Sequence, residues 1–229
     1  GQFGINYVTH IADVKNASFS GVYRLSDVDY VSLHGQYLDY GDIVGTDEIG
    51  TITGDFKAKD AAITLGYARE IADYWTVGAN IKYINSSIEM YKSSAIGVDL
   101  GISFHDFDDR TKVGLVFRNI GKQIQTFSGK RERLPLQVNL GLAHELEHVP
   151  LELSLTLHDL QKFDISQTYN KSGQEVNTGR KIADHIAVGA ELFPGKDFNL
   201  RLGYNFKRGN ELAIEGVRSL SGLTYGFGV

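Results

Sequence analysis

The sequence predicts an all-β fold, an antiparallel up-and-down transmembrane β-barrel with about twelve strands. Apolar residues alternate with polar ones along most of the chain, no helical period separates these segments, and short turns alternate with longer polar loops. A period of two places successive side chains on opposite faces of a strand. Spanning a bilayer takes about 9–11 tilted residues per strand, and most of the alternating segments are that long.

The composition excludes several other classes of protein. The 229 residues are 42% hydrophobic and 22% charged, as expected for one folded domain. The formal net charge of −5 and the lack of a Lys/Arg cluster argue against a nucleic-acid binder. Cysteine is absent, which excludes disulfides and thiolate metal sites. No run of about 18 apolar residues exists, so we expect no transmembrane helix.

The clearest strand pair spans residues 74–105. Each strand has one apolar set and one set of Gly, Asn, Lys, Asp, Ser and His, which suits a wet interior better than a dry core. The apolar sets are Trp75, Val77, Ala79, Ile81 and Tyr83, then Ile96, Val98, Leu100, Ile102 and Phe104. The same alternation predicts further strands, most of them roughly 8 to 15 residues long. Their clearest alternating parts are residues 3–7, 18–25, 31–40, 61–67, 113–117, 136–142, 151–157, 186–192, 198–206 and 223–229.

The connections between these strands are sorted by length. Short turns are expected at Ser26, Glu70, Asp106, Glu147 and Pro194, and longer polar loops at Gly41, Tyr91, Gly121, Lys162 and Arg208. In an up-and-down sheet every second connection lies at the same end. This asymmetry is typical of outer-membrane barrels, with short periplasmic turns and longer extracellular loops. A soluble β-sandwich also alternates, but it needs no sorted loops and its strands are shorter.

Aromatic residues at the strand ends are consistent with interfacial girdles. The candidates are Tyr37, Tyr40, Tyr67, Tyr74, Trp75, Phe104, Tyr204 and Phe206. Both chain ends fall inside alternating segments, so we expect a single barrel domain over residues 1–229 that is incomplete at both termini.

Candidate chemical sites are few. His144 and His148 fit the H-E-x-x-H spacing of zinc proteases, but that motif requires a helix, and here it spans a strand end and a turn. Asp106, Asp108 and Asp109 form an acidic turn without the glycine and glutamate of a calcium loop. We therefore predict no catalytic, cofactor-binding or metal site, and no enzyme.

Other polar residues are expected to be structural or to line the interior. We interpret His10, His34, His158 and His185 as single lumen or interface residues of their strands. Five charged residues share the polar faces of their strands, where we expect pairing rather than a pore lining. They are Lys82, Asp99, Glu152, Arg201 and Lys207.

Several segments resemble the PorQ family of the Bacteroidetes type IX secretion system. They are residues 61–69, Arg118-Asn119-Ile120-Gly121 with Phe117 before it, residues 134–142, the His158-Asp159-Leu160-Gln161-Lys162 run with residues 153–157, and residues 200–206. The family is similar in fold to FadL-like barrels of fourteen strands. The resemblance thus implies a FadL-like barrel with about twelve strands present.

The resemblance also implies function, partners and location. It implies a non-enzymatic outer-membrane component that holds a PorZ-like surface protein while cargo is linked to lipopolysaccharide, with PorU and PorV as further partners. We expect the long loops at residues 121–133 and 161–180 to be extracellular and to dock the partner. The alternative is a FadL-like transporter of hydrophobic small molecules, which needs an apolar pocket in the lumen. The polar residues expected to face the lumen favour the first function.

Overall fold

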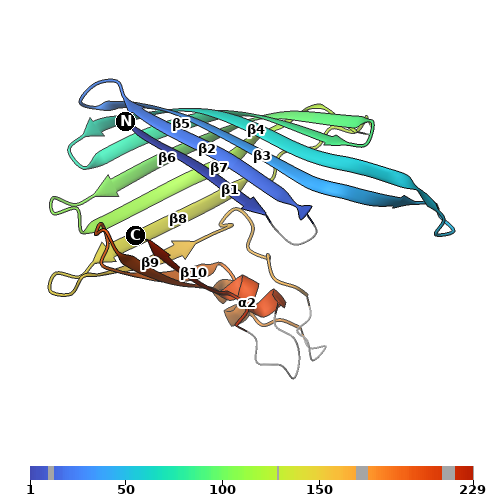
Figure 1. The fold of residues 1–229 in the computed structure, drawn as a ribbon. Helices are drawn as coiled ribbons and strands as arrows, with labels where there is room; N and C mark the ends of the chain where they lie inside the picture. The colour runs from blue at the N-terminus through green and yellow to red at the C-terminus, as the bar shows by residue number, and fades with distance from the viewer. Residues whose placement is uncertain (10–12, 128, 169–174, 213–219, 229) are drawn as a thin grey trace. The chain divides into compact units, whose positions relative to one another are not determined.

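The computed structural model describes residues 1–9, 13–127, 129–168, 175–212 and 220–228. These residues form twelve strands in one sheet whose order follows the chain (Figure 1). The strands are β1 (Gln2–Thr9), β2 (Lys15–Arg24), β3 (Asp29–Thr46), β4 (Ile52–Ala72), β5 (Trp75–Ile88), β6 (Tyr91–His105), β7 (Thr111–Gln125), β8 (Gln137–Glu145), β9 (Leu151–Leu157), β10 (Ile186–Leu192), β11 (Asn199–Asn205) and β12 (Leu223–Gly228). The predicted antiparallel up-and-down sheet is confirmed.

None of the helices in the described residues has both the length and the apolar character needed to cross a membrane.

The chain divides into two compact units. Unit 1 comprises residues 1–72, 76–100 and 118–136, and unit 2 comprises residues 73–75, 101–117 and 137–229. The strands β1 to β4 therefore belong to unit 1, and β8 to β12 belong to unit 2.

Two connections of unit 1 differ from the prediction. Residues 41–54 were predicted as a polar hairpin region and counted among the longer loops. They do form a hairpin, but β3 and β4 remain paired through most of it, and only residues 47–51 form a turn. Strands β5 and β6 are joined by Glu89 and Met90 instead of a longer loop at Tyr91. Glu89 adopts a left-handed backbone with φ of 54°, which suits a tight reversal. Polar composition predicted loops because it does not distinguish a loop from a solvated two-stranded ribbon.

The alternation in β7 changes phase at Asn119. Phe117 is exposed before this residue, whereas Ile120 and Ile124 are exposed after it, so the outward positions change from odd to even numbers. Asn119 has a positive φ of 63°, the backbone of an extra residue inserted into a strand. Two residues later, Gly121 lies against the backbone of Ile96 in β6, where a Cβ atom would collide with the carbonyl oxygen.

The stretch expected as a free loop at residues 121–133 folds back on its own strand. Lys122 and Arg133 form a bridge, and the backbone N–H of Leu134 donates to the carbonyl of Gly121 at 3.0 Å. Leu134 reaches Gly97 of β6, with its Cδ1 atom 2.8 Å from the position that a Cβ on Gly97 would take. The part of this stretch that the structure describes is therefore largely attached to the sheet; Ser128 lies outside the described residues.

Unit 2 contains two short helices that the strand pattern did not predict. They are α1 (Thr178–Ala183) and α2 (Phe206–Leu212). Phe206 and Lys207, expected in a strand, instead begin α2. The side chain of Asn205 accepts a hydrogen bond from the backbone N–H of Arg208 at 2.9 Å, which caps the helix and ends the strand.

The predicted sorting of connections is confirmed only in part. Residues 126–136, 158–185 and 206–222 form the long connections, and they alternate with shorter ones at 106–110, 146–150 and 193–198. In the N-terminal half the alternate connections at 47–51 and 89–90 are short, because the strands themselves extend further.

Candidate functional site

One face of unit 1 exposes apolar side chains in register across neighbouring strands. The face carries every second residue of β1 to β4: Ile5 lies opposite Phe19, Phe19 opposite Gly35, and Gly35 opposite Ile63. We call this the apolar face. Along β4, Ala61, Ile63, Leu65 and Tyr67 are exposed, while the smaller residues between them are half-buried. A soluble sheet buries its large apolar side chains, so this arrangement is inverted.

Charged rows bound the apolar face at both ends. At one end Asp29 lies opposite Arg69, and at the other Asp39 lies opposite both Lys15 and Lys59. Ten residues of β3 separate the two aspartates, or about 33 Å at ~3.3 Å per residue. A strand tilted by about 40° would cover roughly 25 Å of membrane depth, which equals the apolar band of outer-membrane barrels.

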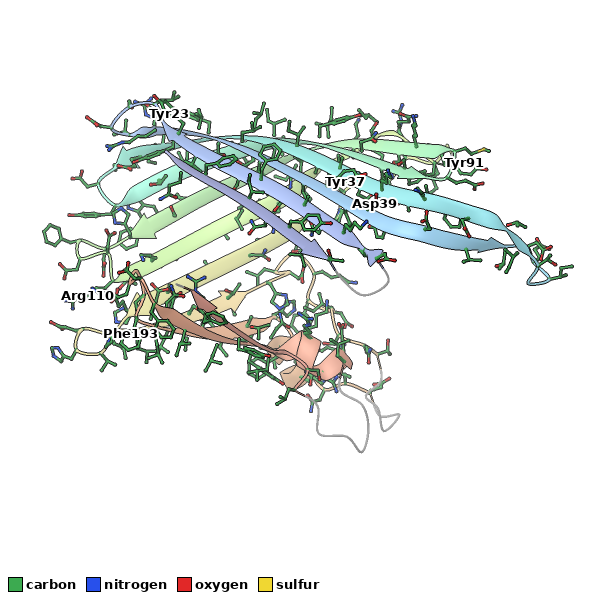
Figure 2. All side chains as sticks on the ribbon, in the orientation of Figure 1. Tyr23, Tyr37, Asp39, Tyr91, Arg110 and Phe193 are labelled. Carbon is green, nitrogen blue, oxygen red and sulfur yellow. The ribbon has the colours of Figure 1, made fainter. Side chains whose placement is uncertain are left out.

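Tyrosines stand at both borders of this band. The hydroxyl of Tyr67 donates to Asp29 at 2.5 Å, and that of Tyr37 donates to Asp39 at 3.4 Å. Figure 2 shows Tyr37 next to Asp39 on β3, and Tyr23 on β2. Aromatic rings with a polar end are typical of the girdles at the two membrane interfaces. Tyr40, also expected in a girdle, instead bonds Asp60 on the opposite face at 2.7 Å.

The apolar face of unit 2 has the same character. Leu153, Leu202 and Tyr225 belong to one row across β9 to β12 and are exposed. Leu100 in unit 1 is likewise exposed. In the described residues the buried apolar set is limited to Ala58, Ala95 and Val176, whereas charged side chains such as Lys82 and Asp99 are buried. In each unit the large apolar side chains therefore lie exposed on one face of the sheet and the charged side chains lie on the other, as expected of a sheet that contacts lipid.

The opposite, polar face of unit 1 is held by a buried ion pair. Lys82 Nζ lies 2.7 Å from Asp99 Oδ1 and 2.8 Å from Asn119 Oδ1. The backbone N–H of Asn119 donates to the same Asp99 oxygen at 2.8 Å, and its side-chain amide donates to the carbonyl of Pro135 at 3.0 Å. The pairing expected of the charged residues on the polar faces is confirmed for Lys82 and Asp99, which are each other's partners. Their contacts with Asn119 fix the point at which β7 changes phase.

The polar face of unit 2 carries a charged row. Glu152 lies beside Glu145 and Glu191, and Glu191 lies beside Arg201 on the next strand. Arg201 contacts Glu191 at 3.1 Å, and Lys112 contacts Glu152 at 3.5 Å. The pairing expected of Glu152 and Arg201 is confirmed, with partners that the sequence did not identify. Lys207 is not part of this face, because it lies in α2.

Next to the charged row, the polar face of unit 2 is hollow. We call this hollow, of about 510 Å³, the trough; its floor is made of small residues. A Cβ atom on Gly114 would have no neighbour within 4 Å, and one on Gly141 would meet only the Gly114 carbonyl at 4.0 Å. The lining residues are Ser103, Phe104, His105, Asp109, Lys112, Val113, Gly114, Gly141, Leu142, Ala143, Ser154 and Thr156. The trough has room for a small molecule.

Beyond the trough, a polar cluster holds the connection between β9 and β10. The ring nitrogens of His185 lie 2.7 Å from the carbonyl oxygen of His158 and 3.0 Å from that of Phe163. Carbonyl oxygens only accept, so both contacts are hydrogen bonds only when the ring is doubly protonated. Asp184, with 1% of its surface exposed, accepts from Ser166 at 2.6 Å and from Asn210 of α2 at 2.5 Å.

His158 completes this cluster. Its Nδ1 lies 3.0 Å from the Asp159 carboxylate. Partial burial acts to raise the pKa of Asp159, but hydrogen bonds from His158 and Gln161 outweigh it and hold the pKa below its ordinary value. His158 and His185 were predicted as single strand residues. They lie instead at the two ends of one connection, with ring centroids 6.4 Å apart, and so belong to one cluster.

Three of the remaining sequence candidates, His144, Asp106 and Asp109, have local structural partners. His144 in β8 bonds the hydroxyl of Thr111 at 3.0 Å, while His148 lies in the turn after β8. Asp106 accepts from the backbone N–H groups of Arg110 and Thr111 and so closes its own turn. Asp109 contacts His105 at 2.7 Å. Among the other candidates, Asp108 is exposed in that turn, His34 is half-buried in β3, and His10 lies outside the described residues.

Comparisons with known proteins identify the fold. No protein-family model and no curated protein matches the chain, so the resemblance to the PorQ family gains no support from them. Among solved structures, a deltaS2 mutant of the monoaromatic hydrocarbon channel TodX is 14% identical, with a TM-score of 0.57 over 98% of this chain and 77% of that one. The TodX deltaS2S3 mutant is 13% identical, with a TM-score of 0.52 over 98% and 78%. The toluene transporter TbuX of Ralstonia pickettii is 12% identical, with a TM-score of 0.45 over 93% and 64%. At these identities the comparison with TodX shows the FadL-like fold alone.

Proposed function

We propose that the chain is part of an outer-membrane β-barrel through which small apolar molecules cross. The similar folds of known hydrocarbon channels support this function, which the sequence had suggested only as the alternative. The structural observation that carries it is the trough of unit 2. The apolar face is suited to lipid, so the hollow on the opposite face lies where a permeating molecule would travel.

The lining of the trough suits a weakly polar passenger. Gly114, Gly141 and Ala143 leave mainly backbone and carbon atoms on its floor, while Lys112 has the carboxylate of Glu152 as its partner. An apolar molecule would therefore slide over the floor without separating a charged pair. The residues expected from the sequence to face the lumen are polar, but in unit 2 small residues leave the floor of the trough open.

A size series at Gly114 tests the proposal. Gly114→Phe places a ring in the trough, whereas Gly114→Ala adds a methyl group that meets no atom within 4 Å and is the matched control. Cells that make the full-length protein should take up labelled toluene. The Phe variant should lower uptake to the level of cells without the protein, and the Ala variant should retain it. Toluene uptake that the protein does not increase would refute transport, and equal uptake by the Phe variant would refute the path through the trough.

The second candidate function is attachment of a PorZ-like surface protein in the type IX secretion system. The feature that favours it is the polar cluster, because Asp184 ties the connection at residues 158–185 to α2 and gives it a defined surface. The part of this connection at residues 169–174 lies outside the described residues. PorU, PorV and lipopolysaccharide would then be further partners, with this connection on the outside of the cell.

Deletion of residues 161–180 tests the second function. The shortened protein should still show the gel shift of a folded barrel on heating, but a pull-down should no longer recover the PorZ-like protein. Asp184→Asn is a milder change that retains the loop. If the deletion leaves capture unchanged, the loop is not the attachment site. If wild-type protein also captures nothing, the secretion function is refuted.

A further inference from the structure

Strands β3 and β4 continue past the charged row of Lys15, Asp39 and Lys59 as a two-stranded ribbon (Figure 1). We call residues 40–58 the ribbon. Its turn begins at Asp47, eight residues after Asp39, which corresponds to roughly 25 Å along the strand. The apolar band ends at the charged row. The ribbon therefore stands outside the lipid.

The ribbon has an open edge along β3. Lys15, the first residue of β2, lies opposite Asp39, so β2 does not reach the ribbon. In the described residues β3 therefore has only β4 as a strand partner from Asp42 to Thr46. On the other side, the turn after β5 meets β4 at Lys57, whose carbonyl accepts from Glu89 at 2.9 Å. Unpaired N–H and C=O groups along an edge form a template for a further strand.

The tip of the ribbon is ordered and apolar. Asp47 Oδ1 accepts from the backbone N–H groups of Ile49 at 3.1 Å and of Thr51 at 2.7 Å, which fixes the turn. The exposed fractions of its large apolar residues are 88% for Ile49, 69% for Ile52 and 57% for Val44. Large apolar residues on a fixed surface with a polar rim are typical of protein interaction sites.

The charge of the ribbon selects the occupant. It contains four carboxylates, Asp42, Asp47, Glu48 and Asp55, against the single cation Lys57. Lys57 is 3.4 Å from Asp42, so one of the four is compensated. Anionic lipids would be repelled by this excess negative charge, and a basic protein segment would be attracted.

We propose that the ribbon binds an extended, positively charged segment of a protein outside the membrane, which adds as a strand to β3 at residues 42–46. Asp42 and Val44 lie on one face of the ribbon with Asp55 and Lys57, and Ile43 lies on the other with Phe56. A bound strand therefore presents basic side chains to the acidic face and apolar side chains to Ile43 and Phe56. This interaction goes beyond transport and does not depend on it.

The test uses full-length protein in nanodiscs and a labelled short peptide of alternating Lys and Val. Fluorescence anisotropy should show binding to the wild type. A variant in which Asn-Gly replaces residues 40–58 should not bind, and it should keep the barrel because Asp39 and Lys59 are already cross-strand partners. The double variant Asp42→Asn with Asp55→Asn should weaken binding. The control is Asp108→Asn, which removes an exposed carboxylate in unit 2 and should not change binding.

Three further arms separate strand addition from attraction by charge alone and from lipid binding. A peptide of alternating Glu and Val should not bind, and the Lys-Val peptide with alternate backbone nitrogens methylated should lose binding despite its unchanged charge. Equal binding of the methylated peptide would refute strand addition. Equal binding to the ribbonless variant would refute the site. Competition by lipopolysaccharide vesicles at the ribbon would make the occupant a lipid and overturn the proposal. Toluene uptake by the ribbonless variant should stay unchanged, so the result of the peptide-binding test does not depend on the result of the transport test.

Discussion

Asp99→Asn removes the negative charge that compensates the buried Lys82 ammonium. The two side chains are each 10% exposed and their charged atoms lie 2.7 Å apart. Loss of one partner of a buried ion pair costs about 3–5 kcal/mol, because the remaining charge stays desolvated without compensation. The amide oxygen of the new Asn can still accept from the N–H of Asn119, so the expected loss is at the lower end, about 3 kcal/mol.

Urea unfolding of the protein in lipid vesicles measures this loss. Trp75 is the single tryptophan, so its fluorescence reports on one position. With a denaturant slope of about 3 kcal/mol per molar, the midpoint should fall by about 1 M. The control is Asp27→Asn, which removes an exposed ion pair with Arg24 at 3.2 Å and should change stability by less than ~1 kcal/mol.

The double variant Lys82→Met with Asp99→Asn isolates the pair itself. It removes both charges, so it should lose about 2 kcal/mol less than the sum of the two single variants. The reasoning would be refuted if Asp99→Asn moved the midpoint no further than Asp27→Asn. Strict additivity of the two single changes would also refute it.

Three other changes test the two faces and one turn. Leu202→Arg puts a charge on the apolar face and should cost about 2–4 kcal/mol in lipid vesicles; an unchanged urea midpoint would contradict lipid exposure. Gly121→Ala should lose roughly 1–3 kcal/mol by overpacking against β6, whereas Gly114→Ala should be neutral. The backbone N–H of Thr111 donates to Asp106 and lowers the pKa of this carboxyl below its ordinary value of 3.8. The turn should therefore be stable above pH 3.8 and loosen as the pH falls through the lowered pKa. Amide exchange should show this acid step in the wild type, and Asp106→Asn should abolish it.

The period of two was sufficient to predict the sheet and its two faces. This pattern is informative because each strand must place apolar side chains on the face toward lipid and polar side chains on the other face. The type of nearly every strand residue is therefore constrained. Leu100, Leu153 and Leu202 are accordingly exposed, and Lys82 is buried against Asp99. Val98 was also expected to be exposed to lipid, but it is half-buried.

Features that depend on contacts between distant residues could not be predicted in this way. The cluster of His158, His185 and Asp184 forms because the connection from β9 to β10 folds back on itself, which brings Phe163 and Ser166 to His185 and Asp184. Neither histidine has a partner at a recognisable spacing in the sequence. The trough exists because Gly114 and Gly141 have no side chains to fill it. Glycines elsewhere in the chain serve other purposes, such as the close approach of the backbone at Gly121, so the sequence alone does not reveal the trough. The rows of exposed residues could be predicted, but their partners across the sheet could not.

The phase change at Asn119 keeps the large apolar residues of both halves of β7 on the exposed side of the strand. The two halves of β7 follow opposite parities, so each half fits its own surroundings although a single uninterrupted alternation could not serve both. If β7 paired regularly through Asn119, without an extra residue at this point, Ile120 and Ile124 would point toward the side where Lys82 is buried. Deletion of Asn119 would instead leave Ile120 and Ile124 facing outward, because Ile120 would then follow Phe117 by two positions. Its cost would be the loss of the side-chain contacts of Asn119 with Lys82 and the carbonyl of Pro135.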